Sequence, residues 1–123
     1  MYAQISPTTK KGELTMPNIN AAYDKAQVLA VHNTKLYQFL QTKKGEMELS
    51  AQVLKLGTNV TDTLRRAWKS GDPKTIAEKV ATALEAIKAM EDLYDSLYAG
   101  GNLPERSYHA FKAECNQLRE LLK

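Results

Sequence analysis

Hydrophobic residues recur along most of the chain with the period of an amphipathic α-helix. After Pro17 the first stripe advances in alternating steps of three and four residues, which places its members on one side of a helix. It consists of Ile19, Ala22, Ala26, Leu29, Asn33, Leu36 and Leu40. Either Asn18 or Asn20 is a suitable N-cap. Residues 1–17 contain two prolines and no sustained period, so we expect a flexible or irregular N-terminal arm there.

Three further stripes have the same spacing and are separated by short segments of turn-forming residues. The second is Leu49, Val53, Leu56, Val60, Leu64 and Ala67; the third is Ile76, Val80, Ala83, Ile87, Met90, Tyr94 and Leu97; the fourth is Tyr108, Phe111, Cys115, Leu118 and Leu122. No segment has the alternating pattern of a β-strand. The chain is therefore expected to be all-α.

The segments between the stripes carry recognisable helix stop and start signals. Lys43–Glu48, which contains Gly45, is predicted to be a turn. Asp72 and Pro73 match an N-cap followed by the first helical position, and Gly100-Gly101 ends the third helix before a fourth begins near residue 104. Because short connections make sequential helices antiparallel neighbours, residues 18–123 are predicted to form one up-down-up-down four-helix bundle.

One stripe position, one glycine within a helix and several off-stripe residues depart from a simple amphipathic pattern. Asn33 is the one amide on the first stripe, and such a residue usually sets register or oligomeric state, with a binding role as the alternative. Gly57 lies within the second helix, where it permits close approach of a neighbouring helix. Apolar residues outside the narrow stripes are Leu54, Trp68, Leu84, Leu93 and Leu121. They are consistent with either a wider core or a subunit interface.

Composition restricts the class of protein without assigning a function. A chain of 123 residues, 43% hydrophobic and 25% charged, is typical of one folded domain. Its single cysteine excludes an internal disulfide and a multi-thiolate metal site. The sequence contains neither a membrane-spanning apolar run nor the apolar core of a signal peptide, so we expect a cytoplasmic protein without a membrane partner.

Residue patterns of common catalytic sites are absent, and no enzyme activity, metal or cofactor is expected. There is no glycine-rich phosphate loop, two-histidine zinc helix or nucleophile elbow. Glu105 and His109 are spaced to touch on one helix face, which is more typical of a surface pair than of a metal site. Cys115 lies on the apolar stripe and is expected to be a buried, inert thiol rather than a catalytic partner of His109.

Basic residues are unevenly distributed, which suits either an anionic partner on one face or head-to-tail self-association. Residues 43–71 hold six basic and three acidic residues, whereas residues 72–99 hold three basic and six acidic residues. Lysine and arginine on a rigid face bind phosphates in a salt-sensitive way, and Trp68 is placed to stack on an unpaired base. The candidate nucleic-acid-binding residues are Lys55, Arg65, Arg66, Lys69 and Lys74, followed by Lys43 and Lys44.

Three segments match a known pattern in order and spacing: LSAQVLKLGTNV at residues 49–60, ALE at 83–85 and GNLPERSY at 101–108. With them the chain resembles, over about residues 20–123, the four-helix-bundle family of 23S rRNA intervening-sequence proteins. The same superfamily contains the accessory variability determinants (Avd) of diversity-generating retroelements. Departures from the intervening-sequence pattern are Thr63 and Arg66 in place of Asn and Glu, and Ala89 in place of Glu.

The resemblance implies a homopentameric ring that binds RNA or DNA through basic surface and lacks catalytic residues. In retroelement members the bundle is a partner of a reverse transcriptase, and the added charge of Arg66 favours that branch. Two alternatives stay open. One is an intervening-sequence-type protein of uncertain role, and the other is a protein-interaction scaffold whose separated charges serve self-assembly without nucleic acid.

Overall fold

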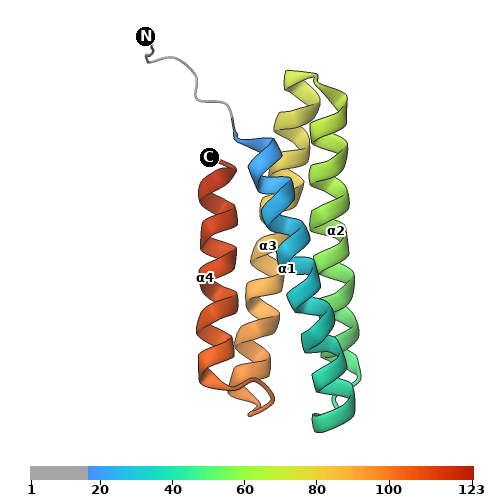
Figure 1. Cartoon of the computed structure of the whole chain (residues 1–123), viewed down its shortest axis with the longest axis vertical. Coiled ribbons are helices and arrows are strands. Elements are labelled where there is room, and N and C mark those ends of the chain that lie inside the picture. Colours follow the sequence, from blue (N-terminus) through green and yellow to red (C-terminus); the bar gives the residue numbers. More distant parts are fainter. Residues whose placement is uncertain (1–16) are drawn as a thin grey trace.

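The computed structural model describes residues 17–123 and consists there of helices, with no β-strand. The helices are α1 (Ile19–Phe39), η1 (Leu40–Lys44), α2 (Glu48–Ser70), α3 (Pro73–Ala99) and α4 (Glu105–Leu121). Figure 1 shows the four α-helices running up and down beside one another, which confirms the predicted four-helix bundle. The predicted arm, apart from Pro17, lies outside the described residues.

Helix ends follow the local sequence signals closely. Asn18 is the N-cap of α1, where its side chain accepts a hydrogen bond from the backbone N–H of Ala21 at 3.2 Å. Asp72 caps α3 by accepting from the backbone N–H of Thr75 at 3.0 Å, and Pro73 follows as predicted. Gly71 ends α2 with a φ of 65°, a left-handed conformation that favours glycine.

The predicted turn at Lys43–Glu48 is wrong at its start. Helical structure continues beyond Phe39 as the π-helical turn η1, which includes Lys43 and Lys44 and ends at Gly45 with a φ of 66°. The connection to α2 is therefore shorter than expected. Glu46 compensates for the missing side-chain cap of α2, because its carboxylate accepts from the backbone N–H groups of Leu49 and Ser50 at 3.1 and 2.8 Å.

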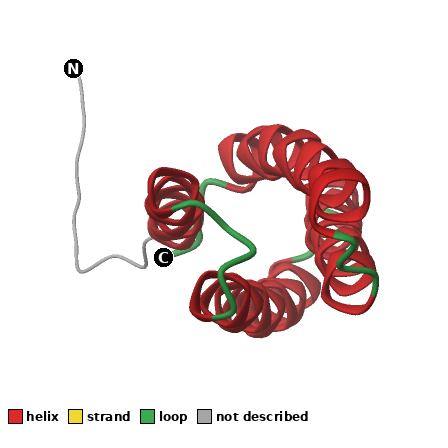
Figure 2. Ribbon diagram, turned by 90° about the horizontal axis from the view of Figure 1, so that it is seen from below, coloured by secondary structure: helices red, strands yellow, loops and turns green. Residues whose placement is uncertain are grey.

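The apolar stripes meet in one core between the helices. Figure 2 shows the arrangement of the helices from below, along the length of the bundle. Most stripe residues are buried, including Leu29, Leu64, Ile87 and Leu118. Four stripe positions lie at the edge of the core and are half-buried: Leu49, Leu56, Ile76 and Tyr108.

The off-stripe residues do not all behave alike. Leu93 is buried, and Leu84 and Leu121 pack against the core while half-buried, which supports the prediction of a wider core for these three. Leu54 is also half-buried. Trp68 is different, because 50% of its surface is exposed at the end of α2.

The amide of Asn33 and the missing side chain of Gly57 form one packing feature. An ideal Cβ at position 57 would lie 2.8 Å from Asn33 Nδ2, so glycine provides the space that the buried amide occupies. Asn33 Oδ1 accepts a hydrogen bond from the buried hydroxyl of Tyr94, and Nδ2 lies 3.5 Å from Met90 Sδ. Gly57 therefore accommodates a side chain of α1 rather than a neighbouring backbone, and α1, α2 and α3 are joined at this level.

The seam between α1 and α4 is held at one end and open at the other. At the start of α1, the backbone N–H of Asn18 donates to the carbonyl of Leu121 at 3.0 Å. Further along, Glu114 on α4 contacts α1 twice, with His32 Nδ1 at 2.9 Å and Lys25 Nζ at 3.5 Å. Beyond this contact the two helices diverge toward the lower end of the bundle in Figure 1. Within residues 17–123 no helix is long and apolar enough to cross a membrane.

Candidate nucleic-acid interface

The candidate basic residues lie along α2 and at both of its ends rather than in one cluster. A helix of 23 residues is about 34 Å long, so Lys43 and Lys44 before its start are far from Lys69 at its end. Lys74 follows in the first turn of α3, at the same end of the bundle as Lys69. Lys55 lies between the two groups. The structure therefore places the candidates in a long stripe.

Two of the predicted residues share one carboxylate, a contact that was not predicted from the sequence. Arg65 and Arg66 both pair with Asp62, and Arg66 Nε lies 3.1 Å from Asp62 Oδ2. These three side chains together carry one net positive charge instead of two. The signal was present in the sequence, because residues three and four positions apart on a helix are neighbours.

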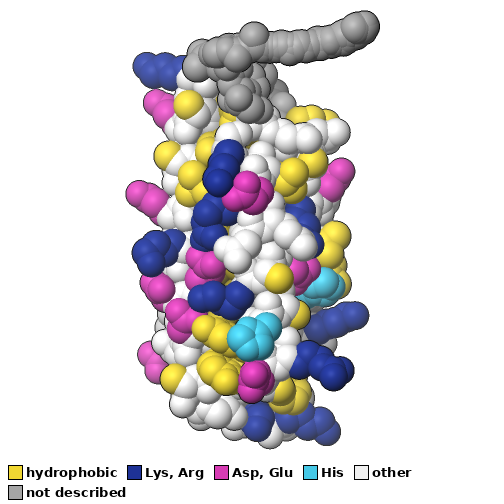
Figure 3. Space-filling view, turned by 90° about the vertical axis from the view of Figure 1, so that its left-hand side faces the viewer, with side chains coloured by type: hydrophobic (Ala, Val, Ile, Leu, Met, Phe, Trp, Pro, Cys, Tyr) yellow, Lys and Arg dark blue, Asp and Glu magenta, His cyan; other side chains and the backbone are white. Residues whose placement is uncertain are grey.

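The lysines among the candidates are more accessible to an anion. Lys43, Lys44, Lys55, Lys69 and Lys74 are exposed, and none forms an ion pair with a carboxylate of residues 17–123. Lys55, Arg66 and Lys69 are spaced to share one side of α2. In contrast, the face over α4 in Figure 3 shows basic and acidic side chains interspersed. The α2 side is thus the better candidate for an electrostatic interface.

An exposed aromatic pair lies at the same end of α2 as Lys69. Trp68 stacks against Tyr23 of α1, with ring centroids 5.8 Å apart and an angle of 18° between the planes. Tyr23 in turn packs against the core. One face of the indole is therefore held by a partner that is itself fixed in the bundle.

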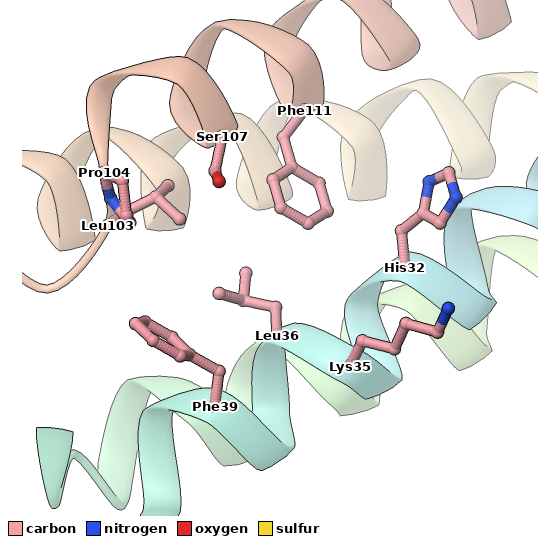
Figure 4. Close-up of a pocket in the computed structure, with 8 residues that line it drawn as sticks. All are labelled: His32, Lys35, Leu36, Phe39, Leu103, Pro104, Ser107 and Phe111. Atoms are coloured by element: carbon pink, nitrogen blue, oxygen red, sulfur yellow. The ribbon is translucent and has the colours of Figure 1, made fainter. Parts of the chain in front are cut away.

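An apolar groove is the second site-like feature, and it lies where α1 and α4 diverge (Figure 4). Its volume is about 280 Å³. Apolar side chains from α1 on one side, and from α4 and the segment before it on the other, face one another across the groove, and His32 and Lys35 lie at one end in Figure 4. The remaining lining residues are Leu36, Phe39, Leu103, Pro104, Ser107 and Phe111. This groove was not predicted from the sequence, because it depends on the divergence of two helices that are not adjacent in sequence.

Residues considered for catalysis or metal binding have ordinary structural surroundings. Cys115 is buried, as predicted, and burial raises the pKa of its thiol to about 12. His109 is exposed, and its Nε2 lies 3.6 Å from Glu105, which confirms the predicted surface contact. No cluster of three or more potential metal ligands occurs within residues 17–123.

Comparison with known proteins identifies the fold. No protein-family model matches the chain, and no curated protein matches it. Among solved structures, it is similar to a protein of unknown function from the S23 ribosomal protein family of Bacteroides thetaiotaomicron. The TM-score is 0.81 at 24% sequence identity, with 85% of this chain and 94% of the other covered. This similarity shows that the two chains share a fold. The shared fold agrees with the four-helix bundle that the resemblance implied.

Proposed function

We propose that this chain is a non-enzymatic protein that binds RNA or DNA through the basic side of α2. The observation that carries the proposal is the set of exposed lysines along and around α2, which have no carboxylate partner within residues 17–123. Phosphates of a nucleic acid backbone are the anions that such an extended row of cations suits best, because they recur at regular intervals. Binding of this kind is independent of base sequence and weakens as salt rises.

The finer role rests on the resemblance described above. In this proposal the bundle assembles as a homopentamer and acts as an accessory subunit of a reverse transcriptase in a diversity-generating retroelement. A ring of five copies would present the exposed lysines along and around α2 five times, which would raise the affinity for a long nucleic acid through multiple contacts. The assembly is tested by the mass in solution, expected to be five times the 13.8 kDa of one chain.

The first experiment is a titration of labelled structured RNA and single-stranded DNA at several salt concentrations. We expect the logarithm of the affinity to fall linearly with the logarithm of salt concentration. The double variant Lys55→Gln/Lys69→Gln should reduce the slope by about 1.4 on a single strand, since each phosphate contact contributes about 0.7. Lack of binding at low salt would refute nucleic-acid binding by this chain.

The lysine pair is a better probe than reversal of Arg65 and Arg66 to Glu. Because both arginines contact Asp62, that reversal would place three carboxylates side by side and weaken α2 itself. A matched control is Lys88→Gln/Lys123→Gln, which removes the same charge from lysines paired with Asp92 and Glu120. This control should leave the salt slope unchanged. An equal loss in both variants would mean that only net charge matters.

The polymerase partnership has its own test. A reverse transcriptase encoded beside this chain's gene should elute together with it in size-exclusion chromatography of a mixture. Separate elution would remove the accessory role and leave nucleic-acid binding in place. If the chain binds no nucleic acid and its oligomer dissociates at high salt, the protein-interaction scaffold replaces both proposals.

A further inference from the structure

The stacked pair of Tyr23 and Trp68 is a feature that electrostatic binding alone does not explain. Trp68 is 50% exposed, although an indole on a helix that faces a neighbouring helix is normally covered. Its ring is nearly parallel to that of Tyr23, at an angle of 18°, so one face of the indole is occupied. The exposed part of the indole is available to a planar partner.

The position of the pair in the fold keeps the indole in place. Tyr23 is half-buried against the core, and its hydroxyl accepts a hydrogen bond from Gln27 Nε2 at 3.4 Å. Trp68 follows Ala67, which is completely buried. The two rings come from separate helices of one packed core. A planar ligand would therefore meet a platform that needs little ordering on binding.

Two basic residues lie at the same end of α2 as the platform. Lys69 is adjacent to Trp68 in sequence and has no carboxylate partner within residues 17–123, whereas Arg65, one helical turn before Trp68, is paired with Asp62. The nearest carboxylate after the helix end, that of Asp72, is engaged as the cap of α3 by the backbone and side chain of Thr75. An exposed aromatic ring at the same helix end as an exposed lysine can stack on a base while the lysine binds a phosphate of the same strand.

We infer that Trp68 is a stacking platform for an unpaired base, so that this chain prefers single-stranded nucleic acid to duplex. This inference rests on the proposed function and names its substrate class. Bases inside a duplex are stacked on one another and cannot reach a side chain on the bundle surface, whereas a base in a single strand can. Every base has a flat face, so the preference does not depend on base sequence.

The chain provides its own probe for this contact. Trp68 is the only tryptophan in the sequence, so tryptophan fluorescence reports on this site alone. The full chain is titrated with a single strand of about twelve nucleotides and with a duplex of equal length, while anisotropy of a label on the nucleic acid measures binding in parallel. We expect the single strand to quench the tryptophan emission. The duplex should bind without quenching.

Substitutions then measure the contribution of stacking. Trp68→Leu should weaken single-strand binding by about 5-fold to 100-fold and leave duplex binding unchanged, and Trp68→Phe should retain most of the affinity. The matched control is Tyr98→Leu. Tyr98 is 39% exposed and stacked on Tyr108 with centroids 4.3 Å apart, but it lies at the end of α3, far from Lys69. This control should bind like the parent chain.

The outcomes separate this inference from the proposed function. Binding of both nucleic acids with no quenching, and with equal affinities for the parent and Trp68→Leu, would overturn the stacking inference and leave electrostatic binding intact. A change of oligomeric mass in Trp68→Leu without a change in single-strand preference would also overturn it, and would assign the aromatic pair to an interface between copies. Absence of any binding at low salt would refute the proposed function, and the stacking inference with it.

Discussion

Replacement of Gly57 by alanine tests the packing of the bundle, because two effects of opposite sign meet at this position. Alanine is favoured over glycine within a helix by about 1 kcal/mol. However, its Cβ would lie 2.8 Å from Asn33 Nδ2, which is too close for the amide to stay in place. The amide is completely buried and held by Tyr94, so its displacement strains the core and weakens a buried hydrogen bond.

The sizes of the opposing effects determine whether Gly57→Ala raises or lowers the free energy of unfolding. Overpacking of a tight core costs about 1–3 kcal/mol. Loss of a partner for a buried polar group costs a further 1–3 kcal/mol or so. After the gain in helix propensity is subtracted from these two costs, Gly57→Ala should lower the free energy of unfolding by about 1–5 kcal/mol. Equilibrium unfolding in urea, followed by circular dichroism, measures this quantity directly.

A double-mutant cycle makes the test specific. In an Asn33→Ala background the amide is gone, so the same Gly57→Ala change should stabilise the chain, by about 1 kcal/mol at most. The predicted reversal of sign distinguishes a contact with Asn33 from a general intolerance of side chains at position 57. Destabilisation of equal size in both backgrounds would refute the reasoning, and so would stabilisation by Gly57→Ala alone.

Three further predictions concern separate parts of the bundle. Because burial raises the pKa of Cys115 to about 12, its thiol should not react with iodoacetamide in the folded chain at about pH 8 and should react once urea unfolds it; rapid labelling of the folded chain would contradict this. Hydrogen bonds from Lys112 and Tyr108 hold the pKa of Asp95 below its ordinary value of 3.8, so Asp95 stabilises the fold above that pH and loses this effect as the pH falls through its folded pKa. Asp95→Asn should therefore be less stable than the parent near neutral pH, by less than about 1 kcal/mol because the pair is exposed, and a gap that persists in strong acid would contradict the assignment. Glu46→Ala should cost about 0.5–2 kcal/mol by leaving the first backbone N–H groups of α2 without their acceptor, and unchanged urea unfolding would show that water replaces the carboxylate.

Sequence periodicity was sufficient to predict the four helices, since each stripe needs a partner and the connections are short. Contacts between helices required more. Asn33 and Gly57 were both recognised as exceptions, yet their contact was not predicted. The contact can be derived from the sequence, because Asn33 and Gly57 each lie twelve residues from Gly45 at the turn. Residues at equal distances from the turn of an antiparallel helix pair lie at the same height. The third member, Tyr94, comes from α3 and is not related to them by such a count.

The sequence predicted which residues could form the interface but not how they are arranged on the surface of the bundle. Helical spacing places Lys55, Arg66 and Lys69 on one side of α2, and all three side chains are exposed. The separation of Lys43 and Lys44 from Lys69 follows from helix length, but the neutralising effect of Asp62 needed attention to neighbouring turns. The groove between α1 and α4 depends on how far two helices diverge, which no local pattern specifies.

The fit between Asn33 and Gly57 has a consequence for the history of this chain. A side chain at position 57 and an amide at position 33 exclude one another, so neither position can change freely while the other is retained. Descendants of a common ancestor should therefore show correlated substitution: a residue larger than glycine at 57 together with a smaller or apolar residue at 33. Because a single change passes through a less stable intermediate, the pair should also change rarely. Such a pair marks relatives in which the first two helices meet at the same height, even where the rest of the sequence has diverged.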